Sequence, residues 1–349
     1  MQAIVYDSPD ILLKPKEAPI PEPKQNEILV EIYYSGVCHS DLHIYLKDWP
    51  TLKENVIGGH EGIGKVVAVG SNVTNFNLGD FAGIKWLNSA CQTCEFCLSG
   101  KEISCKNGYV ISGYTVNGTF AQYTAVDCAH AVKIPQSLDT KELAGLAPIL
   151  CAGVTVYKAL KLSNLKPGEW VAIPGAGGGL GTYAIQYAKA MGLRVIAIDA
   201  LEKKELCQEL GAEKFIDFKT PSSELIDDII KLTDGGAHGV LNVSVSKIAA
   251  ELSIKYVRYW GVVVLVGIPF DGKWNTDMTD IVMKCIRIVG SSVGNRIDIE
   301  EAIDFYCRGL ISSKTSIIKL DSISDVFDQM QKGTLQGRCV IDVKNSIQS

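Results

Sequence analysis

The sequence predicts an α/β protein with two domains, one rich in β-strands and one built on a doubly wound parallel sheet. Three observations support this prediction. The chain has 349 residues, and domains average about 150 residues each. Up to Leu150, short runs of β-branched and aromatic residues lie between glycines and prolines, as in an all-β domain. From Trp170 onward, apolar runs of strand length alternate with helical periodicity, which is typical of a parallel sheet covered on both faces.

Turn residues separate the predicted elements of the N-terminal part. Residues 142–162 are predicted to be helical, with an interruption around Pro148 because proline has no N–H group to continue the helix. The predicted strands cover residues 28–34, 65–69, 81–86 and 120–126.

The C-terminal part alternates between the two types of element. Leu180, Tyr183 and Tyr187 fall on one face of a predicted helix, and Gly192 ends that helix. A last predicted helix, residues 299–309, leads into a C-terminal tail. The other predicted elements are strands at 170–173, 194–199, 215–218, 240–245 and 262–268 and helices at 202–210, 223–233 and 248–259.

The charge balance and the lack of long apolar stretches limit the function classes. Thirty-four basic residues against thirty-nine acidic ones give a net charge of −5, whereas nucleic-acid and anionic-membrane binders carry an excess of basic residues. No apolar run approaches the roughly 18 residues of a membrane span, and the start of the chain lacks the basic and apolar regions of a signal peptide. We therefore expect a cytoplasmic protein with reduced thiols.

A glycine-rich turn at residues 174–181 lies between a predicted strand and a predicted helix. Glycines let the backbone approach a pyrophosphate, and the helix N-terminus supplies N–H donors. Gly175, Gly178 and Gly181 fit this role, although a purely structural turn has the same composition. Asp199 ends the next predicted strand, close to the spacing of about 20 residues at which a carboxylate binds the ribose hydroxyls. Because that carboxylate would repel a 2′-phosphate, NAD is favoured over NADP; a strand-end turn is the alternative role.

Four cysteines follow one another in a C-x2-C-x2-C-x7-C pattern, formed by Cys91, Cys94, Cys97 and Cys105. Four thiolates this close can surround one tetrahedral zinc ion. Disulfides conflict with a reducing compartment, and the iron–sulfur pattern has a shorter last gap followed by proline. We expect a structural zinc site with no open position. The other cysteines without an assigned role are predicted to be reduced thiols: Cys128, Cys207, Cys285, Cys307 and Cys339.

A second group of possible ligands is dispersed along the chain. His60 and Glu61 lie in a glycine-rich segment, Cys38 precedes them, and Cys151 stands at the entry to the αβ part. A histidine in such a loop is often only a hydrogen-bonded polar residue. Two cysteines and one histidine can nevertheless form a three-ligand zinc site with a fourth position for water or substrate. Spacing alone does not connect Cys151 with Cys38.

Taken together, these motifs resemble those of the zinc-dependent medium-chain alcohol dehydrogenases, specifically the yeast-type, ethanol-active branch. The resemblance covers essentially the whole chain. It implies a GroES-like β-rich catalytic domain formed by residues 1–152 and 289–349, and an inserted Rossmann domain at 153–288. The matching stretches are SGVCHSDLH at 35–43, GGHEG at 58–62, AGIKWLN at 82–88, LCAGVTVYKAL at 150–160, the glycine turn at 175–181, GGAHGV at 235–240 and SSVGNR at 291–296.

The resemblance also implies roles for individual residues. Cys38, His60 and Cys151 would bind a catalytic zinc ion, with Glu61 as an alternative ligand and Asp41 as the hydrogen-bond partner of His60. Ser40 and His43 would form a proton relay. Trp49, Trp86 and Ile268 would shape a narrow alcohol pocket, although the two tryptophans are also compatible with plain core positions. The cofactor would contact Gly175, Gly178, Gly179, Leu180, Gly181, Asp199, Lys204, Ile268 and Arg338.

The activity expected from the resemblance is reversible hydride transfer between NAD and a small primary or secondary alcohol, giving an aldehyde or ketone and NADH. The protein would carry two zinc ions per chain and form a homotetramer. Ser40 stands where this branch usually has threonine, and Ile268 where it commonly has methionine, so the substrate range is open. A carbonyl reductase of bulkier ketones or aldehydes is the alternative. A zinc-free quinone-reductase-like enzyme would lack the seven zinc ligands, and a zinc-ribbon nucleic-acid binder would have a basic patch.

Overall fold

A computed structural model describes residues 1–7, 12–49, 53–269, 272–335 and 337–346 of the chain. The chain divides into two compact units. The first comprises Met1–Cys151, Asn295–Ile303 and Ser312–Ser349, and the second comprises Ala152–Gly294 and Asp304–Ile311. The domain boundaries expected from the sequence, at residues 152–153 and 288–289, remain a prediction about folding units.

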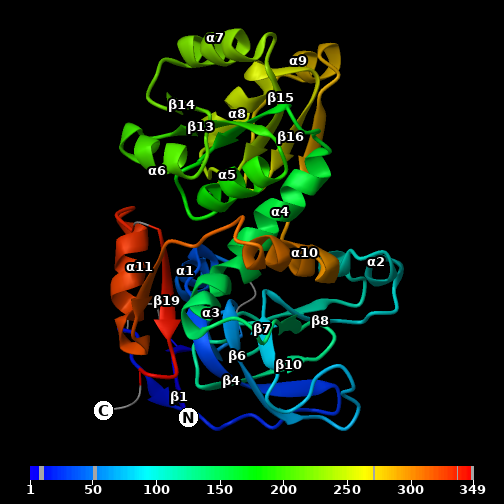
Figure 1. Ribbon diagram of the computed structural model, residues 1–349, viewed down its shortest axis with the longest axis vertical. Helices are drawn as coiled ribbons and strands as arrows, with labels where there is room; N and C mark the ends of the chain where they lie inside the picture. Colours follow the sequence, from blue (N-terminus) through cyan, green and yellow to red (C-terminus); the bar gives the residue numbers. More distant parts are fainter. Residues whose placement is uncertain (8–11, 50–52, 270–271, 336, 347–349) are drawn as a thin grey trace. The chain divides into compact units, whose positions relative to one another are not determined.

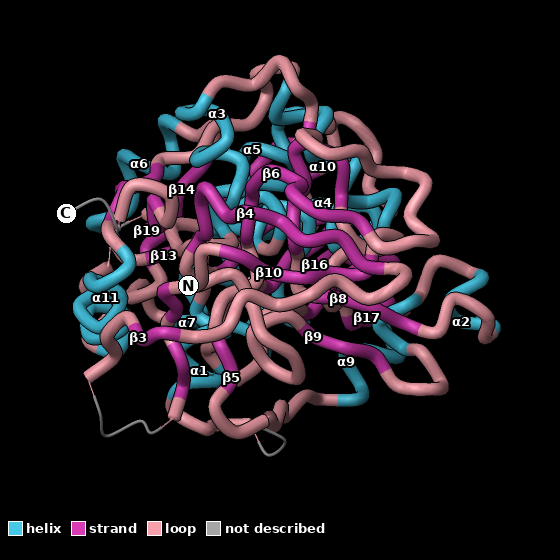
Figure 2. Tube along the Cα trace, turned by 90° about the horizontal axis from the view of Figure 1, so that it is seen from below, coloured by secondary structure: helices cyan, strands magenta, loops and turns pink. Residues whose placement is uncertain are grey.

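The first unit is built on a seven-stranded sheet with the order β11-β7-β6-β4-β19-β18, in which β10 also pairs with β4. Its neighbouring strands are antiparallel, apart from the parallel pair β18–β19. Figure 2 shows the long strand β4 running beside β6 and β10. The strands are β4 (Glu27–Gly36), β6 (Gly62–Val69), β7 (Phe81–Ile84), β10 (Tyr123–Asp127), β11 (Val132–Ile134), β18 (Thr315–Ile318) and β19 (Arg338–Asp342).

Short elements complete this unit. Its helices are α1 (His39–Tyr45), α2 (Glu95–Leu98), α3 (Thr140–Leu146) and α11 (Ile323–Gln331), with 3-10 turns η1 (Glu102–Ser104), η2 (Ala147–Leu150) and η4 (Leu320–Ser322). Three two-stranded ribbons join β1 (Gln2–Ala3) to β3 (Lys16–Glu17), β2 (Val5–Tyr6) to β5 (Val56–Ile57), and β8 (Leu87–Ala90) to β9 (Tyr109–Ile111). One buried apolar cluster links these parts, since Ile32 of β4, Leu42 of α1 and Phe327 of α11 all belong to it.

The second unit is an α/β layer structure around a six-stranded, all-parallel sheet with the order β14-β13-β12-β15-β16-β17. In chain order this is 3-2-1-4-5-6, the doubly wound arrangement whose direction reverses between β12 and β15. The predicted fold class is therefore confirmed. The strands are β12 (Trp170–Pro174), β13 (Arg194–Asp199), β14 (Lys214–Asp217), β15 (Ala237–Asn242), β16 (Val257–Leu265) and β17 (Arg287–Gly290).

Helices follow the strands of this sheet, as Figure 1 shows for α5 to α8 around β13, β15 and β16. All five residues of β12 are buried, which explains its continuous apolar character. Helix α7 instead buries one stripe, Leu225, Ile229 and Thr233, at a spacing of four residues. The helices are α4 (Ala152–Ser163), α5 (Gly181–Ala190), α6 (Lys204–Glu209) preceded by η3 (Leu201–Lys203), α7 (Ser222–Thr233), α8 (Lys247–Tyr256) and α9 (Met278–Met283); α10 (Arg296–Cys307) begins in the first unit.

The helix predicted at 142–162 is interrupted at Pro148 as expected. Helix α3 gives way to η2, which contains this proline, and α4 follows after Cys151. Most apolar side chains of these segments are buried within the protein. Among the described residues, no single helix has the length and hydrophobicity to cross a bilayer, and only 140–150 and 152–163 taken as a bent pair reach those limits.

Other boundaries differ from the sequence prediction. The strand predicted at 240–245 is β15, which begins and ends three residues earlier. The helix predicted at 248–259 ends at Tyr256, because Val257 already pairs with β15 as the first residue of β16. The predicted C-terminal tail contains β18, α11 and β19. Helix α11 has an apolar stripe at Ile323, Phe327 and Met330 that a periodicity search of the tail would have found.

Candidate active site

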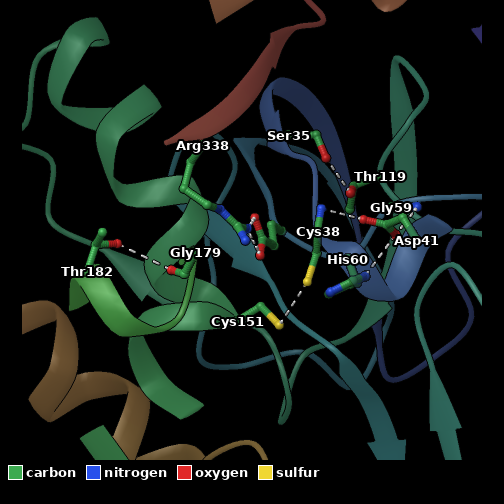
Figure 3. Close-up of polar contacts among 11 residues, drawn as sticks. Ser35, Cys38, Asp41, Gly59, His60, Thr119, Cys151, Gly179, Thr182 and Arg338 are labelled. Carbon is green, nitrogen blue, oxygen red and sulfur yellow. Dashed lines mark hydrogen bonds and ion pairs between the residues drawn. The ribbon is translucent and has the colours of Figure 1, made fainter. Parts of the chain in front are cut away.

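Four side chains with metal-ligand atoms converge in the first unit. The ligand atoms of Cys38, His60, Glu61 and Cys151 all lie within 4.8 Å of one another. The sulfur atoms of Cys38 and Cys151 are 4.0 Å apart (Figure 3). Two thiolates on one tetrahedral zinc ion, each about 2.3 Å from it, are separated by about 3.8 Å. The sulfur pair therefore fits a shared zinc ion.

Local structure brings these residues together from distant positions. Cys38 follows the end of β4 and caps the N-terminus of α1, where its N–H group donates to Asp41 Oδ2 over 2.9 Å. His60 lies in the loop before β6, next to Gly59, whose φ of 90° is readily adopted only by glycine. Cys151 lies between η2 and α4, at the break that Pro148 introduces.

The His60 ring is oriented by a buried carboxylate. His60 Nδ1 lies 3.0 Å from Asp41 Oδ1, which also accepts the N–H of Gly59 over 3.2 Å. Both side chains are fully buried. The carboxylate therefore favours hydrogen on Nδ1, and Nε2 has no hydrogen-bond partner among the described residues. This is the arrangement in which a histidine binds a metal through Nε2 while a carboxylate fixes its tautomer.

The electrostatics of the cluster suit a cation. A hydrogen bond from Cys151, together with the charge of His60, holds the pKa of Cys38 well below its usual value despite burial. Burial disfavours the protonated form of His60, but the charges of Asp41 and Cys38 outweigh it and raise the pKa. Because metal ligands bind in their deprotonated forms, zinc binding here displaces protons and is weakened by acid.

Glu61 forms a buried ion pair with Arg338 of β19. Both carboxylate oxygens accept from Arg338 Nη2, and the Oε2 contact measures 2.6 Å. Burial raises the pKa of Glu61 to about 7, although the charge of Arg338 opposes the rise. The close approach requires glycine at position 36, because a Cβ there would lie 2.0 Å from Glu61 Oε2. The resemblance assigned Arg338 to a cofactor pyrophosphate; here its guanidinium contacts Glu61, and the phosphate role remains a prediction.

Aromatic rings cover the histidine side of this cluster. Trp86 meets the His60 ring edge-on, with centroids 4.8 Å apart. Trp49 packs against Trp86 at 5.9 Å. Tyr114 contacts both tryptophans, at 5.7 Å and 6.4 Å. Sequence reasoning missed Tyr114, since no motif or spacing connects it with the tryptophans.

The two predicted relay residues lie one turn apart on α1. Ser40 is partly buried. His43 is 35% exposed, and its Nδ1 lies 2.7 Å from Asp48 Oδ2. Asp48 was not identified from the sequence, although it lies only five positions beyond His43.

The four-cysteine cluster lies in the same unit, in the segment between β8 and β9. The Cys91 and Cys97 sulfurs are 3.8 Å apart, and those of Cys94 and Cys105 are 4.0 Å apart. N–H and O–H donors of Thr93 and the N–H of Cys94 lower the pKa of Cys91 to about 5. The sulfur geometry fits one tetrahedral zinc ion, and four thiolates fill its coordination shell.

Two polar contacts join this segment to the start of α10 within the unit. Arg296 Nε donates to Glu102 Oε1 over 2.9 Å, and Asn295 Nδ2 donates to the carbonyl of Gly100 over 3.0 Å. Glu102 is 2% exposed, so the carboxylate of the Glu102–Arg296 ion pair is shielded from solvent.

In the second unit, the glycine-rich turn follows β12 at the point where the strand order reverses. The N–H of Gly177 donates to Asp199 Oδ2 over 2.8 Å, and the N–H of Gly178 donates to the Gly175 carbonyl over 3.1 Å. Helix α5 begins at Gly181, where a Cβ would lie 2.1 Å from the Gly175 carbonyl oxygen. The tight turn therefore excludes a larger residue at this position.

A cavity of about 570 Å³ opens beside this turn. Its lining includes Gly175, Asp199, Phe218 and Ser244. Crevices at the carboxyl ends of the strands, at such a reversal, are the usual nucleotide sites of doubly wound sheets. The residues and the cavity thus fit the adenosine part of a dinucleotide.

The remaining predicted cofactor residues have varied surroundings. Leu180 caps α5, and Gly178 and Gly179 lie in the turn before it. Lys204 is exposed at the start of α6, whereas the neighbouring Lys203 packs against Gly177. Ile268 lies after β16 and is 75% exposed. The structure thus brings Lys203 to the turn in addition to the predicted residues.

Comparison with known proteins identifies the family. Residues 24–136 match the alcohol dehydrogenase GroES-like domain, and residues 179–308 match the zinc-binding dehydrogenase domain. The chain belongs to the zinc-binding medium-chain dehydrogenases. It is therefore an oxidoreductase of the alcohol dehydrogenase family, with a GroES-like domain and a Rossmann-like domain.

Solved structures over the full length agree with this assignment. The alcohol dehydrogenase of the archaeon Aeropyrum pernix is 28% identical, with a TM-score of 0.88 over 98% of this chain and 99% of that one. A cinnamyl alcohol dehydrogenase of Sorghum bicolor is 26% identical, with a TM-score of 0.87 over 100% and 99%. The acetophenone reductase of Geotrichum candidum, solved with NAD, is 28% identical, with a TM-score of 0.84 over 99% and 98%.

Proposed function

We propose that this dehydrogenase oxidises small primary or secondary alcohols with NAD, reversibly, to aldehydes or ketones. The observation that carries the proposal is the donor set of Cys38, Cys151 and His60. Their ligand atoms lie within 4.8 Å of one another, and His60 Nε2 has no hydrogen-bond partner among the described residues. Bound zinc would supply Lewis acidity at the alcohol oxygen, and bound NAD would supply the hydride acceptor.

The chain's own residues would position and protect the reacting groups. Asp41 fixes the tautomer of His60, so that Nε2 stays available. Trp49 and Trp86 would form the walls of a narrow alcohol pocket and exclude water from it. The lower dielectric constant would strengthen electrostatic interactions inside the pocket. Ser40 would take the hydroxyl proton of the substrate and hand it to His43, whose partly exposed ring would release it to solvent.

Glu61 would act as the alternative ligand of the catalytic zinc. Its ion pair with Arg338 keeps the carboxylate next to the ligand cluster without committing it to the metal. Cys91, Cys94, Cys97 and Cys105 would hold a second, structural zinc ion.

The proposed cofactor is NAD. The Asp199 carboxylate would bind the adenosine ribose and repel a 2′-phosphate. The turn glycines, Leu180 and the start of α5 would bind the pyrophosphate, assisted by Arg338. Lys204 and Ile268 would complete the cofactor contacts, with Ile268 also facing the substrate. A yeast-type homotetramer in the cytoplasm, with no nucleic-acid or membrane partner, is part of the same proposal.

A carbonyl reductase of bulkier ketones or aldehydes is the second candidate. It is favoured by the similarity of the chain to a cinnamyl alcohol dehydrogenase and an acetophenone reductase. Ser40 and Ile268 are the two departures from the yeast-type pattern, and the resemblance assigns both positions to the alcohol pocket.

A substrate panel tests the proposal. Zinc-loaded protein is mixed with NAD or NADP and with ethanol, 2-propanol, benzyl alcohol and cinnamyl alcohol, and nicotinamide reduction is followed by absorbance. We expect turnover with NAD and the small alcohols, and Asp199→Gly should relax the cofactor choice. Glu213→Gln, an exposed carboxylate paired with Arg194, serves as the control. Faster turnover of bulky carbonyls supports the second candidate, and no reduction with any alcohol contradicts both.

A further inference from the structure

The side chain of His43 is held by the segment that follows its own helix. Its Nδ1 lies 2.7 Å from Asp48 Oδ2. Trp49 stacks on the ring, with centroids 5.7 Å apart and planes inclined by 29°. His39, one turn earlier on α1, faces the ring from another side at 5.1 Å.

The backbone reinforces this side-chain contact. The N–H of Lys47 donates to the Ile44 carbonyl over 3.1 Å, and the N–H of Asp48 donates to the His43 carbonyl over 3.0 Å. Lys47 has a φ of 59°, in the left-handed region. These features define a Schellman motif, which closes the C-terminus of α1. Asp48 and His43 are thus joined twice, once through the backbone and once through their side chains.

The carboxylate decides which ring nitrogen of His43 accepts a proton. Ionised carboxylates only accept hydrogen bonds, so Asp48 selects the tautomer with hydrogen on Nδ1. Nε2 is then left with the lone pair.

We propose that Asp48 is a positioning residue that holds His43 with Nε2 as the proton acceptor during alcohol oxidation. This inference rests on the proposed function. The O–H bond of the substrate breaks, its proton passes through Ser40, and a new N–H bond forms at His43 Nε2. The imidazolium then returns that proton to water, so the ring ends each turnover unchanged.

Kinetics provide the first test. Asp48→Asn preserves the size of the side chain but brings an NH2 group that can donate to Nδ1 and so favours the opposite tautomer. We expect kcat at neutral pH to fall about fivefold with little change in KM, as for loss of a partly exposed charge pair that orients a base. The deficit should shrink at high pH, where hydroxide replaces the relay. Asp48→Glu should recover part of the rate, and Lys47→Gly, which keeps the turn, should behave as wild type.

A double mutant separates positioning from a general structural effect. If Asp48 acts through His43, adding Asp48→Asn to His43→Gln lowers kcat no further. An additional fivefold loss in that background would overturn the inference. A His43→Gln variant with the wild-type rate and pH profile would refute the relay itself.

The tautomer can also be observed without turnover. Solid-state ¹⁵N NMR of the zinc-loaded protein, labelled at its five histidines, identifies His43 by comparison with His43→Gln. At a pH where the ring is neutral, we expect hydrogen on Nδ1 in the wild type and a shift toward hydrogen on Nε2 in Asp48→Asn. An unchanged tautomer in the variant would overturn the inference. If the wild type oxidises no alcohol, the proposed function fails, while this spectrum still decides the role of Asp48.

Discussion

The first unit contains two clusters of metal-ligand side chains that are built in opposite ways. The Cys38–His60–Glu61–Cys151 cluster, termed here the mixed cluster, draws its members from the end of β4, the loop before β6 and the end of η2. Three of its four side chains are buried. The thiolate cluster, Cys91, Cys94, Cys97 and Cys105, comes from one short stretch around α2 and η1, and two of its members are only partly buried.

Under the proposed function, this difference separates a reactive metal site from a structural one. In the thiolate cluster every donor is a cysteine, so a zinc ion there has no exchangeable position. In the mixed cluster the fourth donor is a carboxylate already paired with Arg338. Such a donor can leave the coordination shell without becoming an isolated buried charge, which leaves room for substrate.

Removing a proposed ligand of the mixed cluster should have the largest effect on catalysis. Cys38→Ser should lower kcat more than about a hundredfold, because even residues that only support a metal ligand contribute 10- to 100-fold. Turnover and circular dichroism check this, since the core of the unit lies elsewhere and the fold should persist. Activity within a few-fold of wild type would show that Cys38 is not a ligand.

The matched change in the thiolate cluster should act on stability. Cys105→Ser should lower the free energy of unfolding by about 4 kcal/mol, the contribution of a ligand present at about a thousand times its Kd. In freshly purified Cys105→Ser protein that has not been heated or denatured, kcat should remain near the wild-type value. Thermal melts with and without added zinc measure the effect, and an unchanged melt would remove the structural role of this site.

The Glu61–Arg338 pair offers a further contrast, because its carboxylate belongs to the mixed cluster itself, whereas the thiolate cluster consists of four cysteines. Arg338→Met leaves Glu61 buried without its partner, which should destabilise the protein by about 3 kcal/mol. Adding Glu61→Gln should restore much of that loss. Urea denaturation of the two variants provides the measurement, and equal stability of both would argue against an energetic coupling.

The two buried histidines described in this unit differ in the charges that surround them. His60 faces Asp41, whereas His130 is buried near the positive charges of Lys85 and Arg296. Burial is the main cause that lowers the pKa of His130 to about 3, and these charges add to it.

His130 should therefore have no effect on stability at neutral pH and an effect only in acid. Its folded-state pKa lies below the value of about 6.5 in an unfolded chain, so the unfolded state binds the extra proton. Stability is complete above about pH 6.5 and is lost as the pH falls toward 3, by up to about 1.4 kcal/mol per pH unit. His130→Leu should flatten this slope relative to wild type in urea titrations at several pH values. Parallel slopes would contradict the assignment.

Most of the fold could be predicted from the sequence, and the residues proposed as ligands do converge in two clusters. Periodicity located β12, α5, β13 and α7 to within one or two residues because their apolar patterns are regular. The local spacing of the thiolate cluster predicted its geometry directly. The C-terminal elements β18, α11 and β19 were missed because the tail was not divided into elements, although the apolar stripe of α11 follows helical periodicity.

The mixed cluster shows the limit of sequence reasoning more clearly. Spacing could not bring Cys151 to Cys38, since the chain between them passes through four strands of the sheet, β6, β7, β10 and β11. Only the family resemblance connected them. Tyr114, Asp48 and the Glu61–Arg338 pair were not identified, because each depends on side-chain packing between segments or on the conformation of a turn.

Metal analysis of the purified protein tests whether each chain holds two zinc ions, one in each cluster. Wild-type protein and the Cys38→Ser and Cys105→Ser variants are loaded with zinc, desalted and measured by inductively coupled plasma mass spectrometry. The account predicts two zinc ions per chain in the wild type and one in each variant, with turnover lost only when the ion of the mixed cluster is missing. A single zinc ion in the wild type, or two in Cys38→Ser, would contradict it.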